Sequence, residues 1–339
     1  MPRAMAATEH LPAQPDGLPS GEFRERRDIR DIPTRVDRLF DRITFTSGLI
    51  VLGLLLLVGY FLLLRSRLAF QSQGTGFFTR AVWNTANGKP ALGVLGLLVG
   101  TIVVAVIAIA VALPLAVCAA LFITEYAPDR WKRTLTSFID LFAAIPSLIY
   151  GLWGVVVLAP RVGSLSGWIT RHFGWVPFLS VRSGADLLRS FFIAGLVVAL
   201  MCLPIIASVV REVFAQCPAG EKEAALALGG TRWGMVKSVV LPYGRGGIIG
   251  GSMLGLGRAL GETIAVALIL PQTPRLWGHI LESGGGTVAG FIAQRAGGDS
   301  LTVSGLLAAG LVLFAVTLGT NMLASVVIAR SRSGAGVDI

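Results

Sequence analysis

Six long apolar segments constrain this chain more than any other feature of its sequence. Each is long enough to approach or exceed the roughly 20 residues that an α-helix needs to cross a bilayer. Their predicted bounds are 43–64, 92–119, 135–159, 190–210, 246–270 and 301–327. Only 14% of the residues are charged, whereas a soluble domain carries about 25%. The sequence therefore predicts an all-α polytopic membrane protein with six transmembrane helices.

Lys and Arg residues outside these segments are unevenly distributed. If the N-terminus is cytoplasmic, 18 of the 29 Lys and Arg lie on the cytoplasmic side, and 10 lie in the loops on the other side. Cytoplasmic loops are enriched in Lys and Arg, so we expect both termini in the cytoplasm. The net charge is +10, but the sequence contains no basic stripe with interleaved aromatic residues. We therefore expect no nucleic-acid partner.

The predicted domain organisation is a polar tail followed by one membrane domain. Residues 1–42 are polar and contain several prolines, which predicts a disordered cytoplasmic tail. Residues 43–330 form the predicted transmembrane domain. One outer loop, 160–189, carries four arginines, which are either ordinary solvated charge or a docking surface for an anionic partner.

Motifs of catalysis and metal binding are missing from the sequence. The three cysteines form no CxxC pair, and the three histidines are scattered, so we expect no metal site. No G-x4-GK[ST] loop occurs, so the chain by itself is not expected to hydrolyse ATP. No HExxH motif and no Ser/His/Asp set occurs either. We expect no catalytic residue and no bound cofactor, and keep a membrane-embedded enzyme and a secondary transporter as alternatives.

The loop 211–245 is longer than a connection between two membrane helices requires. Good helix formers occupy 222–228, after Pro218 at a helix start. Gly229 and Gly230 then end the helix, and a second short helix is predicted over 232–240, before Leu241-Pro242. Two short helices joined by a sharp bend make a rigid knob suited to a groove on another protein.

The residues of this knob resemble the EAA motif of ABC importer permeases, written EAA-x3-G-x9-I-x-LP, with valine here in place of isoleucine. The matching residues are Glu223, Ala224, Ala225, Gly229, Val239, Leu241 and Pro242. The resemblance implies that 211–245 is a cytoplasmic coupling loop that docks on an ATPase subunit. It also implies the type I ABC importer permease fold, with a core over about 92–328.

Four further stretches narrow the resemblance. They are FITEYAPDRWKR (122–133), FAAIPSLIYGLWGVVVLAP (142–160), LPIIASVVREVFAQ (203–216) and LGLGRALGETIAV (254–266). Together they are similar to the permease of bacterial phosphate importers, and the run YGLWG points to the C-type (PstC) of its two paired permeases. The resemblance implies a second, A-type (PstA) permease, an ATPase dimer that binds ATP and Mg²⁺, and an extracytoplasmic phosphate-binding protein. It implies the bacterial inner membrane as the location, and a permease for sulfate, molybdate or phosphonate remains an alternative.

A pair of opposite charges lies inside the fifth apolar segment. Arg258 and Glu262 are four positions apart, so in one continuous helix they share a face. Each charge costs about 2.5–3.5 kcal/mol at a helix centre on insertion scales. Either the pair neutralises itself within the bundle, or Arg258 lines a translocation pathway and offers bidentate donors to phosphate. Thr263 is the third predicted pathway residue. Its hydroxyl forms a hydrogen bond either with the substrate or with the backbone of its own helix.

Small residues and one acid complete the predictions for the membrane segments. Gly247, Gly251 and Gly255 recur every four positions, as do Gly257 and Gly261. This pattern predicts close helix packing, against a partner permease or a neighbouring span. Asp140, near the start of the third segment, is interpreted as a helix-capping charge.

Overall fold

A computed structural model describes residues 35–85, 90–182 and 184–332 of the chain. The chain divides into two units, residues 1–55 and 56–339. Helices form nearly all of the regular structure, which confirms the predicted all-α class, and one two-stranded sheet pairs β1 (Trp83–Asn84) with β2 (Ala91–Leu92). The described residues hold five helices long and apolar enough to cross a membrane, one fewer than predicted.

The first apolar segment forms helix α1 (Arg35–Arg65). It begins eight residues before the predicted segment, so the predicted tail of 1–42 is wrong over 35–42, while residues 1–34 lie outside the described residues. The charged lead-in RVDRLFDR is helical because its apolar residues recur at positions 36, 39 and 40, which is the helical period. Asp37 lies in the first turn, where the helix dipole favours an acid. Two short helices follow, α2 (Arg67–Gln73) and α3 (Gly76–Thr79).

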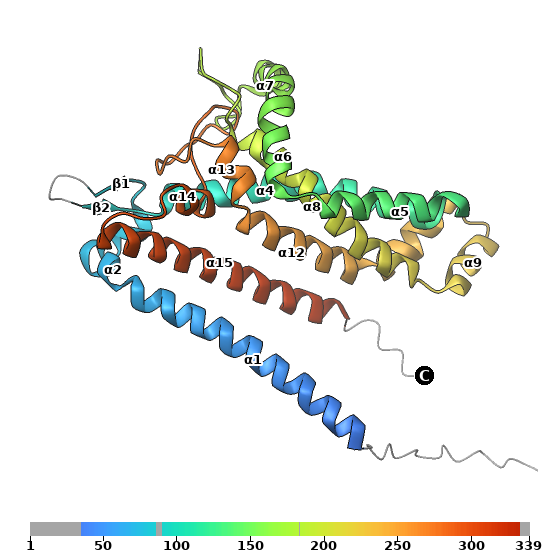
Figure 1. Cartoon of the computed structure of the whole chain (residues 1–339). Helices are drawn as coiled ribbons and strands as arrows, with labels where there is room; N and C mark the ends of the chain where they lie inside the picture. Colours follow the sequence, from blue (N-terminus) through green and yellow to red (C-terminus); the bar gives the residue numbers. More distant parts are fainter. Residues whose placement is uncertain (1–34, 86–89, 183, 333–339) are drawn as a thin grey trace, which may run out of the picture. The chain divides into compact units, whose positions relative to one another are not determined.

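The second and fourth segments form the two central helices, α4 (Leu95–Leu121) and α8 (Phe191–Ala215). In Figure 1 they run side by side, and they make the most extensive helix pair of the fold. Alanines of α4 recur every three or four residues in the core, namely Ala105, Ala108, Ala112, Ala116 and Ala120. Small side chains let two helix backbones approach closely. The last segment forms α15 (Ser300–Arg332).

The third apolar segment, predicted over 135–159, is wrong in its bounds. The chain instead forms α5 (Asp129–Ala144), in which no residue is buried, and then turns at Ile145, whose backbone is extended. Pro146 explains the turn, because proline disfavours the helical conformation of the preceding residue. The candidate span runs over Ser147–Phe173 as α6 (Ser147–Trp153), the π-helix η2 (Gly154–Leu158) and α7 (Ala159–Phe173).

The turn at Pro146 also changes the interpretation of Asp140. This acid is exposed and lies in the C-terminal half of α5, while Asp129 occupies the first turn. The prediction of Asp140 as a capping charge at a helix start is therefore wrong. An acid in that position has no favourable interaction with the dipole of its own helix.

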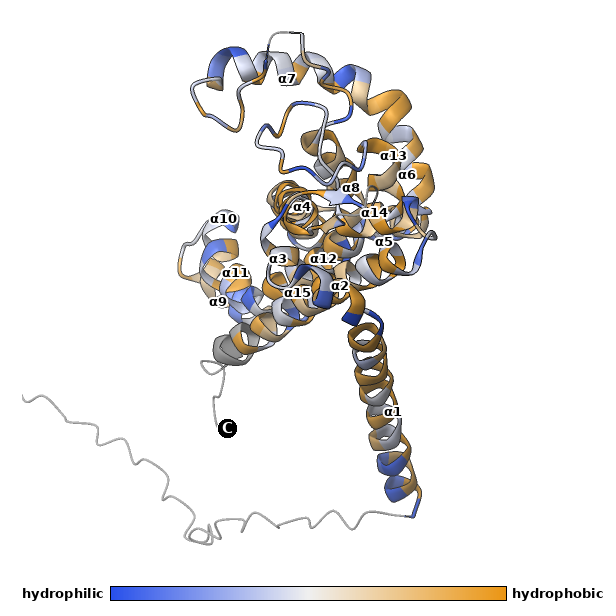
Figure 2. Ribbon diagram, turned by 90° about the vertical axis from the view of Figure 1, so that its left-hand side faces the viewer, coloured by the Kyte–Doolittle hydropathy of each residue, from blue (hydrophilic) through white to orange (hydrophobic). Residues whose placement is uncertain are grey.

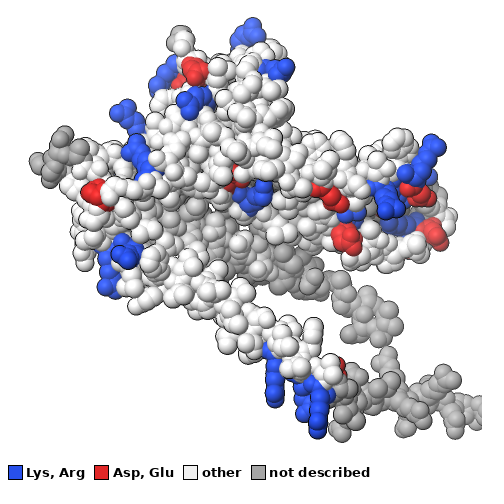
Figure 3. Space-filling model, in the orientation of Figure 1, with Lys and Arg blue, Asp and Glu red and all other residues white. Residues whose placement is uncertain are grey.

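The unit formed by residues 56–339 exposes many apolar side chains, whereas a soluble protein exposes mainly polar ones. Figure 2 shows apolar residues along α5, α6 and α13. Val106, Leu152 and Val156 each expose more than half of their area, which a bilayer would cover. Charged side chains on the face seen in Figure 3 gather mainly around α9 (Ala219–Ala227) and near α7. This distribution is that of a membrane protein with polar ends.

Three glycines of α12 (Arg245–Gly261) pack against the neighbouring helix α8. A Cβ atom built on Gly247 lies 2.6 Å from Val213, and one built on Gly255 lies 2.6 Å from Ile206. The same packing surface includes a hydrogen bond of 3.3 Å from Cys202 Sγ to the carbonyl of Gly255. The predicted close packing is confirmed for these three glycines, and its partner is a span of the same chain. It is wrong for Gly257 and Gly261, because a Cβ atom built on Gly257 meets only Asn321 Oδ1 at 3.9 Å and one built on Gly261 meets no heavy atom within 4 Å.

Gly247→Val is expected to destabilise the helix bundle by about 1–3 kcal/mol, because overpacking forces backbone or rotamer shifts. Val213 is β-branched and has little rotamer freedom in a helix. The matched control is Gly246→Val, since a Cβ atom there meets no heavy atom within 4 Å. The midpoint of thermal unfolding in detergent measures the difference, and equal midpoints for the two variants would contradict the packing argument.

Candidate functional site

The fifth apolar segment is broken where the charged residues lie. Helix α12 ends at Gly261, Glu262 has an extended backbone (φ −64°, ψ 124°), and α13 (Ile264–Ile269) begins after Thr263. The prediction that Arg258 and Glu262 share one continuous helix is therefore wrong. Among the described residues, ion pairs join Lys132 to Asp129 and Lys222 to Glu125, and none joins Arg258 to Glu262.

Glu262 and Thr263 make hydrogen bonds with the backbone at this break. A carboxylate oxygen of Glu262, which is 8% exposed, accepts a hydrogen bond of 3.2 Å from the backbone N–H of Ala265 in the first turn of α13. The hydroxyl of Thr263 donates to the carbonyl of Gly261 at 3.0 Å. Both bonds satisfy polar groups that a helix end leaves unpaired. Of the two interpretations of Thr263, the bond to its own backbone is the one observed.

Arg258 lies on the wall of a cavity between α12 and α15. Its Nε–H is buried and has no hydrogen-bond partner among the described residues. The cavity has a volume of about 630 Å³. Its walls consist of Arg258, Gly250, Met253, Leu254 and Gly257 from α12 with Thr317, Asn321, Ala324 and Ser325 from α15. Buried N–H groups are almost always hydrogen-bonded, so a partnerless guanidinium beside a partly polar cavity has donors available for an anion.

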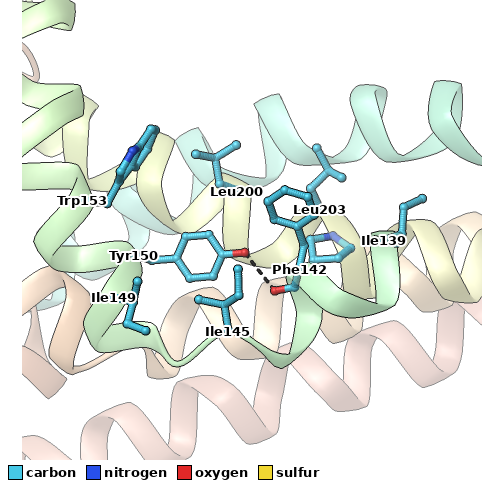
Figure 4. A pocket seen from close by; sticks show the side chains of 9 residues that line it. Ile139, Phe142, Ile145, Ile149, Tyr150, Trp153, Leu200 and Leu203 are labelled. Carbon is cyan, nitrogen blue, oxygen red and sulfur yellow. Dashed lines mark hydrogen bonds between the residues drawn. The ribbon is translucent and has the colours of Figure 1, made fainter. Parts of the chain in front are cut away.

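A second cavity, of about 510 Å³, has a different character (Figure 4). Apolar and aromatic side chains line it, among them Ile139, Ile149, Tyr150 and Leu203. The hydroxyl of Tyr150 donates to the carbonyl of Phe142 at 2.9 Å, which satisfies a carbonyl at the end of α5. No charged residue lines this cavity, so it does not attract an anion.

The predicted knob is confirmed as two short helices with a glycine turn. After α9 (Ala219–Ala227), Gly229 takes a left-handed conformation (φ +83°), which glycine adopts without strain. The chain continues as α10 (Arg232–Met235), the π-helix η3 (Val236–Val240) and α11 (Leu241–Tyr243). The hydroxyl of Thr231 caps α10 by accepting from Gly234 N–H at 3.0 Å.

The EAA residues of the knob divide between its surface and its base. Glu223, Ala224 and Gly229 are exposed, Ala225 is half-buried, and the neighbouring Leu228 is 90% exposed. Val239 and Leu241 pack against the core, while Pro242 lies at the start of α11. The base is thus anchored in the membrane domain, and small and apolar residues at the tip are free for a partner.

An ion pair at the knob was missed by reasoning from the sequence. Lys222 Nζ lies 2.7 Å from Glu125 Oε1, and these side chains are only 19% and 8% exposed. Glu125 lies on the π-helix η1 (Phe122–Tyr126), which extends α4. The pair therefore ties α9 of the knob to the end of a central helix. The two residues are 97 positions apart, and no local pattern predicts such a contact.

Lys222→Ala is expected to lower the free energy of unfolding by about 3–5 kcal/mol, because it leaves Glu125 buried without its counter-charge. The double variant Lys222→Ala/Glu125→Ala is expected to lose less than the single variant. Lys132→Ala is the matched control, because its pair with Asp129 is exposed and worth about 1 kcal/mol at most. Unfolding in detergent gives these differences, and an additive double variant would contradict the pairing.

Comparison with known proteins gives one family and close relatives. Residues 112–333 match the family described as binding-protein-dependent transport system inner membrane component. The chain is 39% identical to the phosphate transport system permease protein PstC 2 of Mycobacterium tuberculosis, over 88% of this chain and 94% of that protein. It is 40% identical to the phosphate transport system permease protein PstC of Mycobacterium leprae, over 91% and 96%.

One solved structure supports the fold. A bacterial ABC transporter involved in the import of the acidic polysaccharide alginate has a chain that aligns with a TM-score of 0.53. The alignment covers 86% of this chain and 99% of that chain at 17% identity, so the likeness concerns the fold alone. With the family match over residues 112–333, it confirms the predicted permease fold. The chain belongs to the family of binding-protein-dependent transport system inner membrane components.

Proposed function

We propose that this chain is a permease subunit of an ATP-driven importer of inorganic phosphate. The observation that carries the proposal is the similarity, at 39–40% identity over nearly their whole length, to permeases named for phosphate transport. The Arg258 cavity supports it independently, because a buried guanidinium N–H without a partner favours an anionic substrate. The family assignment favours this function over the membrane-embedded enzyme and the secondary transporter.

In this proposal phosphate passes along the cavity between α12 and α15. Arg258 contacts a phosphate oxygen, and Glu262 and Thr263 hold the break between α12 and α13 on which the position of Arg258 depends. The role of Glu262 differs from the one first expected, since it caps α13 instead of pairing with Arg258. Gly247, Gly251 and Gly255 hold α12 against α8.

The knob is the proposed contact with the ATPase. We place Glu223, Ala224, Ala225 and Gly229 at the contact and Val239, Leu241 and Pro242 in its anchored base. ATP and Mg²⁺ belong to the partner ATPase dimer, and this chain binds no cofactor itself. Closure of the ATPase dimer moves the knob, and the pair of Lys222 with Glu125 passes this movement to α4.

The remaining parts of the proposal concern partners and orientation. A second permease of the PstA type completes the pathway, and an extracytoplasmic phosphate-binding protein delivers the substrate. We propose that both termini and the knob lie in the cytoplasm at the bacterial inner membrane, and the distribution of Lys and Arg supports this orientation. We keep the predicted order of a cytoplasmic tail followed by a permease domain over 43–330. The tail is limited to residues 1–34, because α1 begins at Arg35.

Uptake by proteoliposomes tests the proposal against the other oxyanions. The complex of this chain with its PstA-type permease, ATPase and binding protein is reconstituted, and uptake of labelled phosphate is followed with excess sulfate, molybdate or phosphonate. Phosphate uptake that depends on ATP and resists the competitors supports the proposal. If the same complex takes up labelled sulfate and not labelled phosphate, the chain is a permease for sulfate.

A further inference from the structure

We propose that a pocket at the base of the knob is a second anion site, which binds a phosphate group. The pocket lies between η1, α5, α8 and α9 and has a volume of about 280 Å³. It shares no residue with the cavity that contains Arg258. The proposal goes beyond the proposed transport of phosphate and does not depend on it.

The charges that line this pocket favour an anion. Lys132, Arg211 and Lys222 contribute three cations, while Glu125 is the only acid in the lining. Lys222 is paired with Glu125, and Lys132 is paired with Asp129, a 95% exposed residue outside the lining. The lining therefore has an excess of positive charge, and an anion would reduce it.

Arg211 is the residue best placed to bind the anion. It is partly buried, and its Nη1 donates to the hydroxyl of Thr136 at 3.3 Å. No carboxylate lies at ion-pair distance from Arg211 among the described residues. The planar guanidinium presents five donors and binds a phosphate group with two parallel hydrogen bonds. Thr136, which accepts from Arg211, keeps its own hydroxyl proton free to donate to the same anion.

The position of the pocket limits the source of the phosphate group. Helix α5 forms one wall; after Asp129 its first turns carry three basic residues, and it exposes Trp131, Phe138 and Leu141. In Figure 1 α5 runs beside α8, and the basic and aromatic residues of its first turns are of the kind found where a membrane helix meets the aqueous interface. The phosphate group therefore comes either from an anionic lipid headgroup or from inorganic phosphate in the adjacent solution. Charged side chains cluster around this end of the fold in Figure 3.

Binding at this pocket would act on the knob. Lys222 belongs to α9, and a phosphate group in the pocket competes with Glu125 for its ammonium group. Occupancy would therefore change how firmly α9 is tied to η1 and α4. The site would act as a sensor of lipid or of phosphate on the side of the membrane that holds the knob.

The test compares two sources of the phosphate group in the assembled complex. In one arm, the complex is purified from membranes that contain phosphatidylglycerol, and native mass spectrometry measures how much of this lipid it retains. In the other arm, the complex without its binding protein is placed in phosphatidylcholine nanodiscs, and equilibrium binding of radiolabelled inorganic phosphate is measured. Both arms use the Arg258→Ala background, which removes binding in the transport cavity.

Arg211→Gln is expected to weaken binding about tenfold in one arm, because a charge-assisted hydrogen bond is lost. The arm that responds identifies the source. Arg133→Gln is the matched control, since it removes the same charge from the exposed face of α5, outside the pocket lining. Binding in both arms that stays within about twofold for Arg211→Gln overturns the proposal.

A second variant keeps the test valid if Arg211→Gln prevents assembly. Thr136→Val retains every charge and removes only the hydroxyl that faces Arg211. We expect it to weaken binding about threefold to tenfold in the responsive arm, and unchanged binding would also overturn the proposal. Neither arm measures transport, so a failure here is distinct from a failure of the proposed importer function.

Discussion

Arg258→Ala is expected to lower phosphate uptake about a hundredfold in reconstituted proteoliposomes. Removing one partner of a buried charge-assisted contact costs about 2–5 kcal/mol, and about 2.8 kcal/mol corresponds to a hundredfold. The guanidinium Nε–H has no hydrogen-bond partner among the described residues. The substitution therefore removes no hydrogen bond that this N–H makes within the described part of the chain. Assembly with the partner subunits is therefore expected to survive, and the loss appears in transport.

Three further variants define the role of Arg258. Arg258→Lys keeps the charge but loses the planar fork, so we expect uptake between those of the wild type and Arg258→Ala. Glu262→Gln retains an oxygen that accepts from Ala265 N–H, so we expect a smaller loss. Arg245→Ala removes an exposed charge at the start of the same helix, outside the cavity, and is the control. Undiminished uptake by Arg258→Ala would remove this residue from the pathway.

The sequence predicts those parts of this fold that depend on continuous local patterns. The runs that became α1, α4, α8 and α15 are uninterrupted apolar segments, and a bilayer allows them little except a helix. The knob was also predictable, because its signals are local. Pro218 favours a helix start, Gly229 favours a helix end, and the residues between them are helix formers. Its observed helix, Ala219–Ala227, begins three residues before the predicted one, since Pro218 directly precedes it.

Two breaks inside apolar segments were not predicted, for related reasons. Hydropathy does not distinguish a helix that continues from one that stops and restarts. Pro146 gave a local signal for the first break, yet the apolar residues on both sides favoured a single span. At the second break Gly261 fitted a packing pattern, although a Cβ atom there meets no heavy atom within 4 Å. Its observed position is the end of α12.

The contacts of the candidate site could not be derived from spacing alone. Four residues separate Arg258 from Glu262, which indicates a pair only if the helix continues between them. The observed partner of Glu262 is a backbone N–H of the next helix, and Arg258 lines a cavity together with α15, which begins more than forty residues later in the chain. The pair of Lys222 with Glu125 likewise depends on tertiary packing. Long-range contacts of this kind require the fold.

Gly229→Pro is expected to uncouple ATP hydrolysis from transport, with at least about a tenfold fall in phosphate imported per ATP hydrolysed. Gly229 has φ +83°, whereas the proline ring fixes φ near −65°. Proline also lacks the N–H that Gly229 donates to the carbonyl of Leu226 at 3.0 Å. The turn between α9 and α10 then has to change, and the tip of the knob moves away from its anchored base.

The matched control is Gly220→Pro, which introduces the same residue into the first turn of α9. N–H groups of a first turn have no partner within the helix, and a Cβ atom at Gly220 meets no heavy atom within 4 Å, so coupling should persist. Gly229→Ala keeps the N–H and costs about 1–2 kcal/mol for its left-handed backbone, and we expect an intermediate ratio. Because α9 is held to α4 by Lys222 and Glu125, a Gly229→Pro variant with an unchanged ratio would show that movement reaches the membrane helices through this pair without the turn.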